Sequence, residues 1–187
     1  MVSASREIAA GAGRIFELIA DPAQQPQWDG NDNLAGAPAG QRVRRAGEVF
    51  TMTLTHDGAI RENHVVEFEE GRRIAWRPAE PGKSPPGHLW RWELEPAGPS
   101  STRVTCTYDW TQLTDPQRLR RARATTAGKL RASLGRLAAS PRHPDRRRAT
   151  AAARQHAWAR RRSRPPGPAR EGRQHAGEGL LHHAGGR

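Results

Sequence analysis

The feature that most constrains this chain is an alternation of apolar and polar residues that recurs between residues 49 and 110. In "HLWRWELEP", which starts at His88, large or apolar side chains alternate with polar ones. Successive side chains of a strand point to opposite faces, so this period predicts strands with one apolar and one polar face. The same alternation recurs in "VFTMTL", "NHVVEF", "RIAW" and "TRVTCTYDW", with turn sequences between the runs. The pattern predicts an antiparallel sheet joined by hairpins, whose apolar face needs a cover.

Helical patterns flank this region and supply the cover. "VSASREIAA" is compatible with a first strand, and the apolar stripe of "RIFELIA" then predicts a helix that ends at Asp21-Pro22. A second short helix or turn delivers Trp28. After the sheet, Thr114-Asp115 is a helix cap before Pro116, and leucines recur at three- and four-residue spacing as far as Leu137. We therefore expect one long amphipathic helix across the sheet.

Charge divides the chain into two parts. The net charge is +12, but residues 1–139 hold 19 Lys and Arg against 16 Asp and Glu, whereas residues 140–187 hold 12 Arg against 3 acids. The second part has only Trp158, Leu180 and Leu181 as large apolar residues, too few to offset the entropy of ordering it. The sequence predicts one folded domain over residues 1–139 and a disordered basic tail over residues 140–187.

The sequence argues against disulfides, a signal peptide, a membrane helix, and cofactor or metal motifs. Cys106 is the single cysteine, so no intramolecular disulfide forms, and we expect a cytoplasmic protein. The N-terminal residues have no apolar signal-peptide core, and no apolar run approaches the roughly 18 residues of a membrane helix. There is no phosphate loop, dinucleotide fingerprint or cysteine-rich metal framework, so we expect neither a cofactor nor a metal. The sequence sets no oligomeric state.

The order strand, two short helices, antiparallel strands and closing helix resembles the helix-grip fold of the START-like (SRPBCC) superfamily. "VSASREIAA" followed by "RIFELIADPAQQPQWDG" looks like the opening of its bacterial polyketide cyclase/dehydrase-type members. "RIAWRP", "WRWELEPAGPSSTRVTCTYDWT" and "SLGRLA" look like their later strands and closing helix, so the resemblance covers residues 2–139. It implies an α+β fold, with a curved sheet of about six to seven strands wrapped on the long helix. Between them it implies a cavity for apolar or aromatic small molecules.

The candidate ligand-binding residues are those that the alternation places on the inner face of the sheet, with Trp28 at its rim and two leucines of the closing helix. An apolar wall with few polar groups is typical of a ligand pocket, although each residue is also compatible with plain core packing. The set is Trp28, Phe50, Met52, Leu54, Val66, Phe68, Trp76, Trp90, Trp92, Trp110, Leu130 and Leu134.

Two candidate catalytic residues stand on the same predicted face. His64 falls among apolar residues, where a neutral imidazole can act as acid or base in an aldol-type ring closure, and Tyr108 can donate to a ligand oxygen. A histidine bonded to the backbone or to Tyr108, or turned outward by a register shift, is the structural alternative. Cys106, in the middle of a strand, is expected to act as a small apolar residue.

Three functions follow as hypotheses. The first is binding of an apolar or aromatic small molecule in the cavity, with polyketide cyclase/dehydrase-like chemistry as one form of it. The second is nucleic-acid association through the arginines of the tail, and the third is an interaction module without a ligand. The tail is almost all Arg, Ala, Gly, Pro and His and begins abruptly within a helix turn, which is typical of a GC-rich gene read out of frame. A frameshift or altered terminus is therefore an alternative to a natural basic tail.

Overall fold

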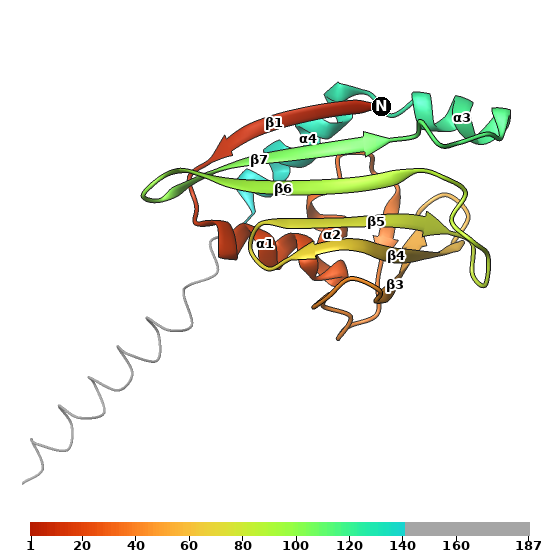
Figure 1. The fold of residues 1–187 in the computed structure, drawn as a ribbon, viewed down its shortest axis with the longest axis horizontal. Coiled ribbons are helices and arrows are strands. Elements are labelled where there is room, and N and C mark those ends of the chain that lie inside the picture. Colours follow the sequence, from red (N-terminus) through yellow and green to blue (C-terminus); the bar gives the residue numbers. More distant parts are fainter. Residues whose placement is uncertain (141–187) are drawn as a thin grey trace, which may run out of the picture. The chain divides into compact units, whose positions relative to one another are not determined.

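The computed structural model describes residues 1–140, and seven strands of this part form a single antiparallel sheet (Figure 1). Their order across the sheet is β1-β7-β6-β5-β4-β3-β2. The strands are β1 (Val2–Ile8), β2 (Leu34–Gly36), β3 (Val49–Leu54), β4 (Ile60–Glu69), β5 (Arg73–Ala79), β6 (Leu89–Gly98) and β7 (Ser101–Asp109). The predictions made for the arginine-rich tail, including its nucleic-acid role, concern residues outside this part from 141 onward and stay predictions.

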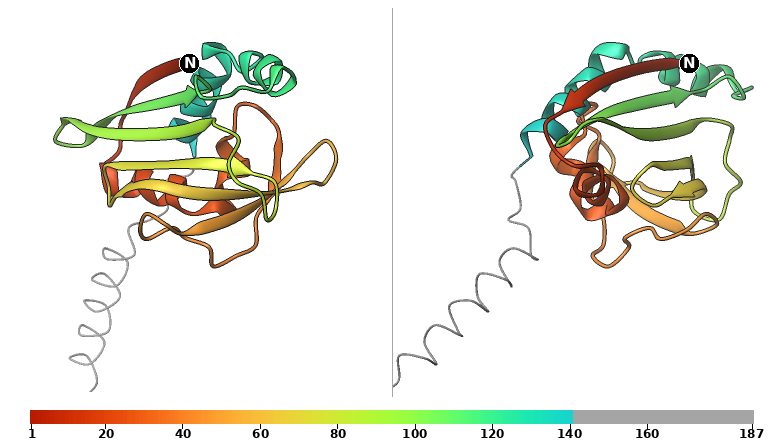
Figure 2. Two further views of the ribbon diagram at one scale, coloured as in Figure 1. Left: turned by 45° about the vertical axis from the view of Figure 1, so that its right-hand side comes forward. Right: turned by 60° about the vertical axis from the view of Figure 1, so that its left-hand side comes forward.

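The helices except α3 lie against one face of the sheet, which curls around them, and α3 lies at the end of β7 (Figures 1 and 2). They are α1 (Ala12–Ala20), the 3-10 helix η1 (Pro22–Gln24), α2 (Gln25–Trp28), α3 (Pro116–Arg123) and α4 (Ala127–Ala139). The buried side chains of α1 and α4 form one core with the inner face of the strands. The predicted α+β helix-grip architecture, a curved antiparallel sheet closed by a C-terminal helix, is confirmed.

The C-terminal helical region is two helices, so the prediction of one long helix is wrong. α3 starts after Asp115, whose side chain accepts from the Gln117 amide at 2.8 Å, and it ends at Arg123. Thr126 has an extended backbone and caps α4, accepting from the Lys129 amide at 3.4 Å. Threonine side chains compete for backbone partners, which favours a cap over a helix interior. The apolar spacing continues across this break, so it did not reveal it.

A bulge in β4 changes which side chains face the core. Val65 pairs with Trp76, and Glu67 pairs with the next residue along, Ala75, so Val66 is an extra residue in the strand. As a result Asn63 and Val65 are buried, whereas Val66 is 39% exposed. The predicted placement of His64 and Val66 on the inner face is therefore wrong. Phe68 returns to the inner face after the bulge and packs edge-on against Phe16.

A close backbone approach attaches α4 to the loop after α2. The Gly30 amide donates to Ser133 Oγ at 2.8 Å. A Cβ at Gly30 would lie 2.4 Å from both the Lys129 carbonyl oxygen and the Ser133 nitrogen, so only glycine fits without movement. This contact holds α2 and α4 together at one wall of the space that the sheet encloses.

Candidate ligand-binding cavity

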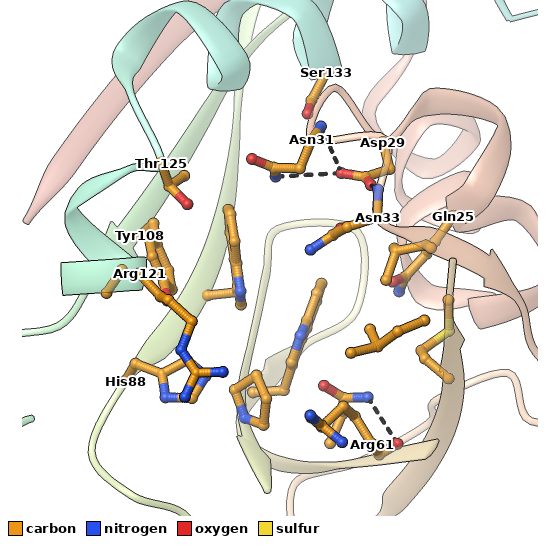
Figure 3. Close-up of a pocket in the computed structure, with 18 of the residues that line it drawn as sticks. Gln25, Asp29, Asn31, Asn33, Arg61, His88, Tyr108, Arg121, Thr125 and Ser133 are labelled. Carbon is orange, nitrogen blue, oxygen red and sulfur yellow. Dashed lines mark hydrogen bonds between the residues drawn. The ribbon is translucent and has the colours of Figure 1, made fainter. Parts of the chain in front are cut away.

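A cavity of about 280 Å³ lies among the sheet, α2 with the loop after it, α3 and α4. This is close to the lower end of the roughly 300–1,000 Å³ that ligand pockets usually have. Aromatic side chains from four elements form much of its wall: Trp28, Trp76, Trp90, Trp92 and Tyr108. Figure 3 draws Arg61, His88 and Arg121 around the lower part of the hollow, with Asp29 and Ser133 above it.

Seven of the residues predicted from sequence lie in the cavity wall. They are Trp28, Met52, Leu54, Trp76, Trp90, Trp92 and Tyr108. Strand alternation brings six of them together, because inward side chains of β3, β5, β6 and β7 meet on the concave face, and α2 supplies Trp28. Their contact with a ligand stays a prediction.

The other predicted binding residues do not line the cavity. Phe50, Leu130 and Leu134 are fully buried and pack in the core, as does the partly buried Phe68. Trp110 packs in a separate cluster with Tyr108, Leu113 and Ala122. These side chains stabilise the fold around the cavity, whereas Val66 lies on the outer face because of the bulge.

The aromatic wall is held in a fixed arrangement. Trp28 donates its indole N–H to the Leu18 carbonyl oxygen at 2.9 Å and meets Trp92 edge-on, with ring centroids 5.0 Å apart. Trp90 stacks on Tyr108 with centroids 4.1 Å apart and an interplanar angle of 19°. Stacked and edge-on pairs of this kind add to the energy of burying the rings. The rings of the wall thus hold one another in place.

One end of the cavity carries a buried carboxylate that its own loop satisfies. Asp29 is 6% exposed and follows directly after α2. Its Oδ1 accepts from the Asn31 amide at 3.1 Å, and its Oδ2 accepts from the Asn33 amide at 3.0 Å. These bonds fix the loop that leads into β2, so the carboxylate serves the fold at this end.

The other end combines a neutral histidine with arginines. His88 precedes β6, and its ring lies edge-on to Tyr108 with centroids 5.9 Å apart. Burial, and then the positive charges of Arg118 and Arg61, lower the pKa of His88 to about 4. Burial raises the pKa of Tyr108 to about 12. Both groups are therefore uncharged near neutral pH, and each can exchange hydrogen bonds with a ligand.

Three polar atoms of the cavity wall are buried without a hydrogen-bond partner in the described part of the chain. They are the indole nitrogen of Trp92, Nδ1 of His88 and Oδ1 of Asn31. A buried polar atom without a partner costs about 1–3 kcal/mol, so such atoms need an explanation. A ligand with polar groups at matching places would supply the missing bonds once the wall moves enough to expose these atoms.

His64, a predicted catalytic residue, and Cys106, predicted to act as a small apolar side chain, both lie away from the cavity. His64 is on the outer face of the sheet, where its Nε2 lies 3.9 Å from a carboxylate oxygen of Glu62, so it is not placed to act on a ligand. Cys106 is fully buried in the core, and burial raises the pKa of its thiol well above the usual value. Cys106 thus stays protonated and acts as a small apolar side chain.

Sequence reasoning missed His88 and Arg61 as site residues. His88 belongs to the same alternating series as Trp90 and Trp92, so that pattern contained the signal. Arg61 shares its face with Asn63, and the bulge further along β4 decides that this face is the inner one.

Within residues 1–140 no three His, Cys, Asp or Glu side chains converge to hold a metal ion. No helix in that range is long and apolar enough to cross a membrane.

Comparison with known families and proteins agrees with this geometry. The model of the family described as "Polyketide cyclase / dehydrase and lipid transport" matches residues 1–140. The uncharacterized protein Rv0088 of Mycobacterium tuberculosis is 31% identical over 111 residues, which cover 58% of this chain and 47% of that protein. The chain thus spans about half the length of the curated relatives it matches.

Solved structures share the fold at low sequence identity. Protein Ms6760 of Mycobacterium smegmatis superposes with a TM-score of 0.53 at 17% identity, over 73% of this chain and 87% of that one. The di-domain ARO/CYC StfQ from the steffimycin biosynthetic pathway superposes with a TM-score of 0.50 at 21% identity, over 75% of this chain and 44% of that one. These likenesses establish the shape of the domain.

Proposed function

The chain belongs to the polyketide cyclase/dehydrase and lipid transport family, and from that premise we propose that it binds an apolar or aromatic small molecule in the cavity. The observation that carries the proposal is the aromatic wall with three unpartnered polar atoms in it. Core packing accounts for buried rings, but it leaves an indole N–H, an imidazole nitrogen and an amide oxygen without partners. A flat ligand would pack on the aromatic rings, and a few polar groups on it would bond to these three atoms.

Binding of the neutral dye N-phenyl-1-naphthylamine tests this function. Its emission rises when it enters an apolar site, and calorimetry gives the affinity independently. We expect saturable binding to the full chain and its loss in Leu54→Trp, because the larger side chain fills space at the cavity wall.

Ile60→Trp is the matched control, since it adds the same indole to an exposed position on the outer face of the sheet. It should bind the dye as the parent does. Absence of saturable binding, or equal binding by Leu54→Trp, would overturn the proposed function.

A second candidate function, favoured by the pair His88 and Tyr108, is dehydration of a bound β-hydroxy ketone. Tyr108 would donate to the ketone oxygen. Neutral His88 would take the proton from the carbon between the two functional groups and return it to the departing hydroxyl, so that an enone and water form. The description of the matching family, polyketide cyclase / dehydrase and lipid transport, supports a search for chemistry of this class.

Aromatic β-hydroxy ketones, followed by the absorbance of the enone, test this chemistry. We expect His88→Gln to lose turnover while it still binds N-phenyl-1-naphthylamine, and His64→Gln, on the outer face, to retain it. No turnover by the parent on such ketones, or equal turnover by His88→Gln, would remove the second candidate.

A further inference from the structure

The charges in the cavity wall are unevenly distributed. Three arginines line it, Arg61, Arg118 and Arg121, against one carboxylate, Asp29. His88 adds no positive charge near neutral pH, because its pKa lies at about 4. The wall is therefore cationic, although the domain as a whole is close to charge balance.

Two of these four charges have partners within the described residues. The Asp29 carboxylate accepts amide hydrogens from its own loop. Arg118 pairs with Glu80, and its Nε lies 3.5 Å from an Asp115 oxygen. Neither group needs a ligand to balance it.

Arg61 and Arg121 differ, because in residues 1–140 neither forms an ion pair with a carboxylate. Arg61 is half-buried on β4 and donates from Nη1 to the carbonyl oxygen of Ile60 at 2.9 Å, which leaves the charge itself unbalanced. Arg91, on the outer face, gives one example of the opposite case. It binds Glu67, with Nε to Oε2 at 3.1 Å.

We propose that the cavity prefers ligands that carry an anionic group, such as a carboxylate or sulfonate, on an aromatic body. Arg61 binds this group within the cavity, and Arg121 adds a second positive charge at its rim. The planar guanidinium fits two oxygens of one anionic group, and its charge is worth more where water is partly excluded. This inference rests on the proposed function, since it names the ligand class for the same cavity.

Two dyes with the same aromatic body isolate the effect of the charge. 1-Anilinonaphthalene-8-sulfonate is N-phenyl-1-naphthylamine with one sulfonate added. We expect the full chain to bind the sulfonate more tightly than the amine. Arg61→Gln should weaken sulfonate binding about tenfold, as the loss of one charge-assisted hydrogen bond implies, and should change amine binding much less.

Controls separate the cavity from other cationic surface. Arg77→Gln removes an arginine from β5 between the cavity-lining Trp76 and Pro78, on the opposite face of the sheet, and should change neither affinity. Arg121→Gln should weaken sulfonate binding less than Arg61→Gln does, and Arg120→Gln is its matched control on α3, because Arg120 does not line the cavity. With the unmutated chain, added sodium chloride should weaken binding of the sulfonate dye and leave binding of the amine unchanged. Leu54→Trp, which keeps the arginines of residues 140–187, shows how much of this salt effect arises outside the cavity.

The outcomes keep the two proposals apart. Equal or tighter binding of the amine, together with no effect of Arg61→Gln, would overturn the anionic preference and leave the proposed function intact. Sulfonate binding that Leu54→Trp does not reduce would also overturn it, because the dye would then lie outside the cavity. If neither dye binds, the proposed function itself fails.

Discussion

At one end of the cavity the carboxylate of Asp29 accepts N–H groups from its own loop, whereas Arg61 and Arg121 have no carboxylate partner among the described residues. Both ends bring charge to the same aromatic wall. They differ in which groups of the chain balance that charge. The Asp29 carboxylate is balanced by its own loop, and this end joins the loop after α2 to α4. The arginine end is incomplete within the domain, and that contrast separates residues that hold the fold from residues available to a ligand.

The largest effect is expected at the Asp29 end from Gly30→Ala. The added methyl would meet the Lys129 carbonyl oxygen and the Ser133 nitrogen at 2.4 Å, so α4 must move away. We expect a loss of about 3 kcal/mol in the free energy of unfolding, measured by urea denaturation. Gly13→Ala in α1 is the control, since its methyl meets nothing within 4 Å and should stabilise the helix slightly. Equal stability of Gly30→Ala and the parent would show that this end is not tightly packed.

At the arginine end, His88 should make stability depend on pH. The pKa of His88 in the folded chain is about 4, below its ordinary value of 6.5. As pH falls, His88 takes up a proton in the unfolded chain before it does so in the folded chain. The contribution of neutral His88 to the free energy of unfolding is therefore complete above pH 6.5 and is lost as pH falls toward 4. Between pH 7 and pH 5 this loss is about 2 kcal/mol.

His88→Gln should remove this part of the pH dependence in urea denaturation, while Arg61, Arg118 and Tyr108 around the ring stay unchanged. His56→Gln, in an exposed turn, should keep the dependence of the parent. Parallel pH curves for the parent and His88→Gln would contradict the burial of a neutral imidazole at this end.

The two ends can be compared directly by removing one charge from each. Asp29→Asn should cost about 1.5 kcal/mol, because hydrogen bonds to a buried charged acceptor weaken and the new amide hydrogens face donors. Arg61→Gln should change stability by less than about 0.5 kcal/mol, because no ion pair is broken. Thermal and urea unfolding of both variants check this difference. A larger loss from Arg61→Gln than from Asp29→Asn would reverse the assignment of the two ends.

The smallest expected effect is electrostatic. Arg61 contributes to the lowered pKa of His88, so Arg61→Gln should raise that pKa, which the ring-proton resonances of His88 report during a pH titration. Arg77→Gln, on the outer face, should leave it where it is. If the pKa of His88 is unchanged in Arg61→Gln, the charge of Arg61 lies too far from His88 for the two residues to form one end of the cavity.

Sequence reasoning reached the fold and the aromatic part of the cavity because both follow from local periodicity. Trp90 and Trp92 alternate without interruption along β6, so their common face was predictable. The bulge at Val66 was not, because it arises from pairing with β5 and leaves no pattern within β4 itself. Because of that single residue, His64 faces outward and Asn63 faces inward. Arg61 lies two residues before Asn63 on the same strand, so it faces inward as well.

The break before α4 was missed for a similar reason. The leucine spacing runs through Thr125 and Thr126, and only the cap geometry shows that a new helix starts there. The charge balance of the cavity could not be predicted from the sequence either, because it depends on which arginines lie close to a carboxylate in the folded chain. Arg118 reaches Glu80, 38 positions away along the chain, whereas Arg61 reaches none within residues 1–140.

The most direct test of the account is the indole N–H resonance of Trp92 in a nitrogen–proton correlation spectrum, assigned with Trp92→Phe. The nitrogen of Trp92 is buried in the cavity wall without a partner, whereas that of Trp28 already donates to Leu18. Saturation with 1-anilinonaphthalene-8-sulfonate should shift the Trp92 resonance strongly and the Trp28 resonance much less. An unmoved Trp92 resonance at saturation would contradict the claim that this cavity is the binding site.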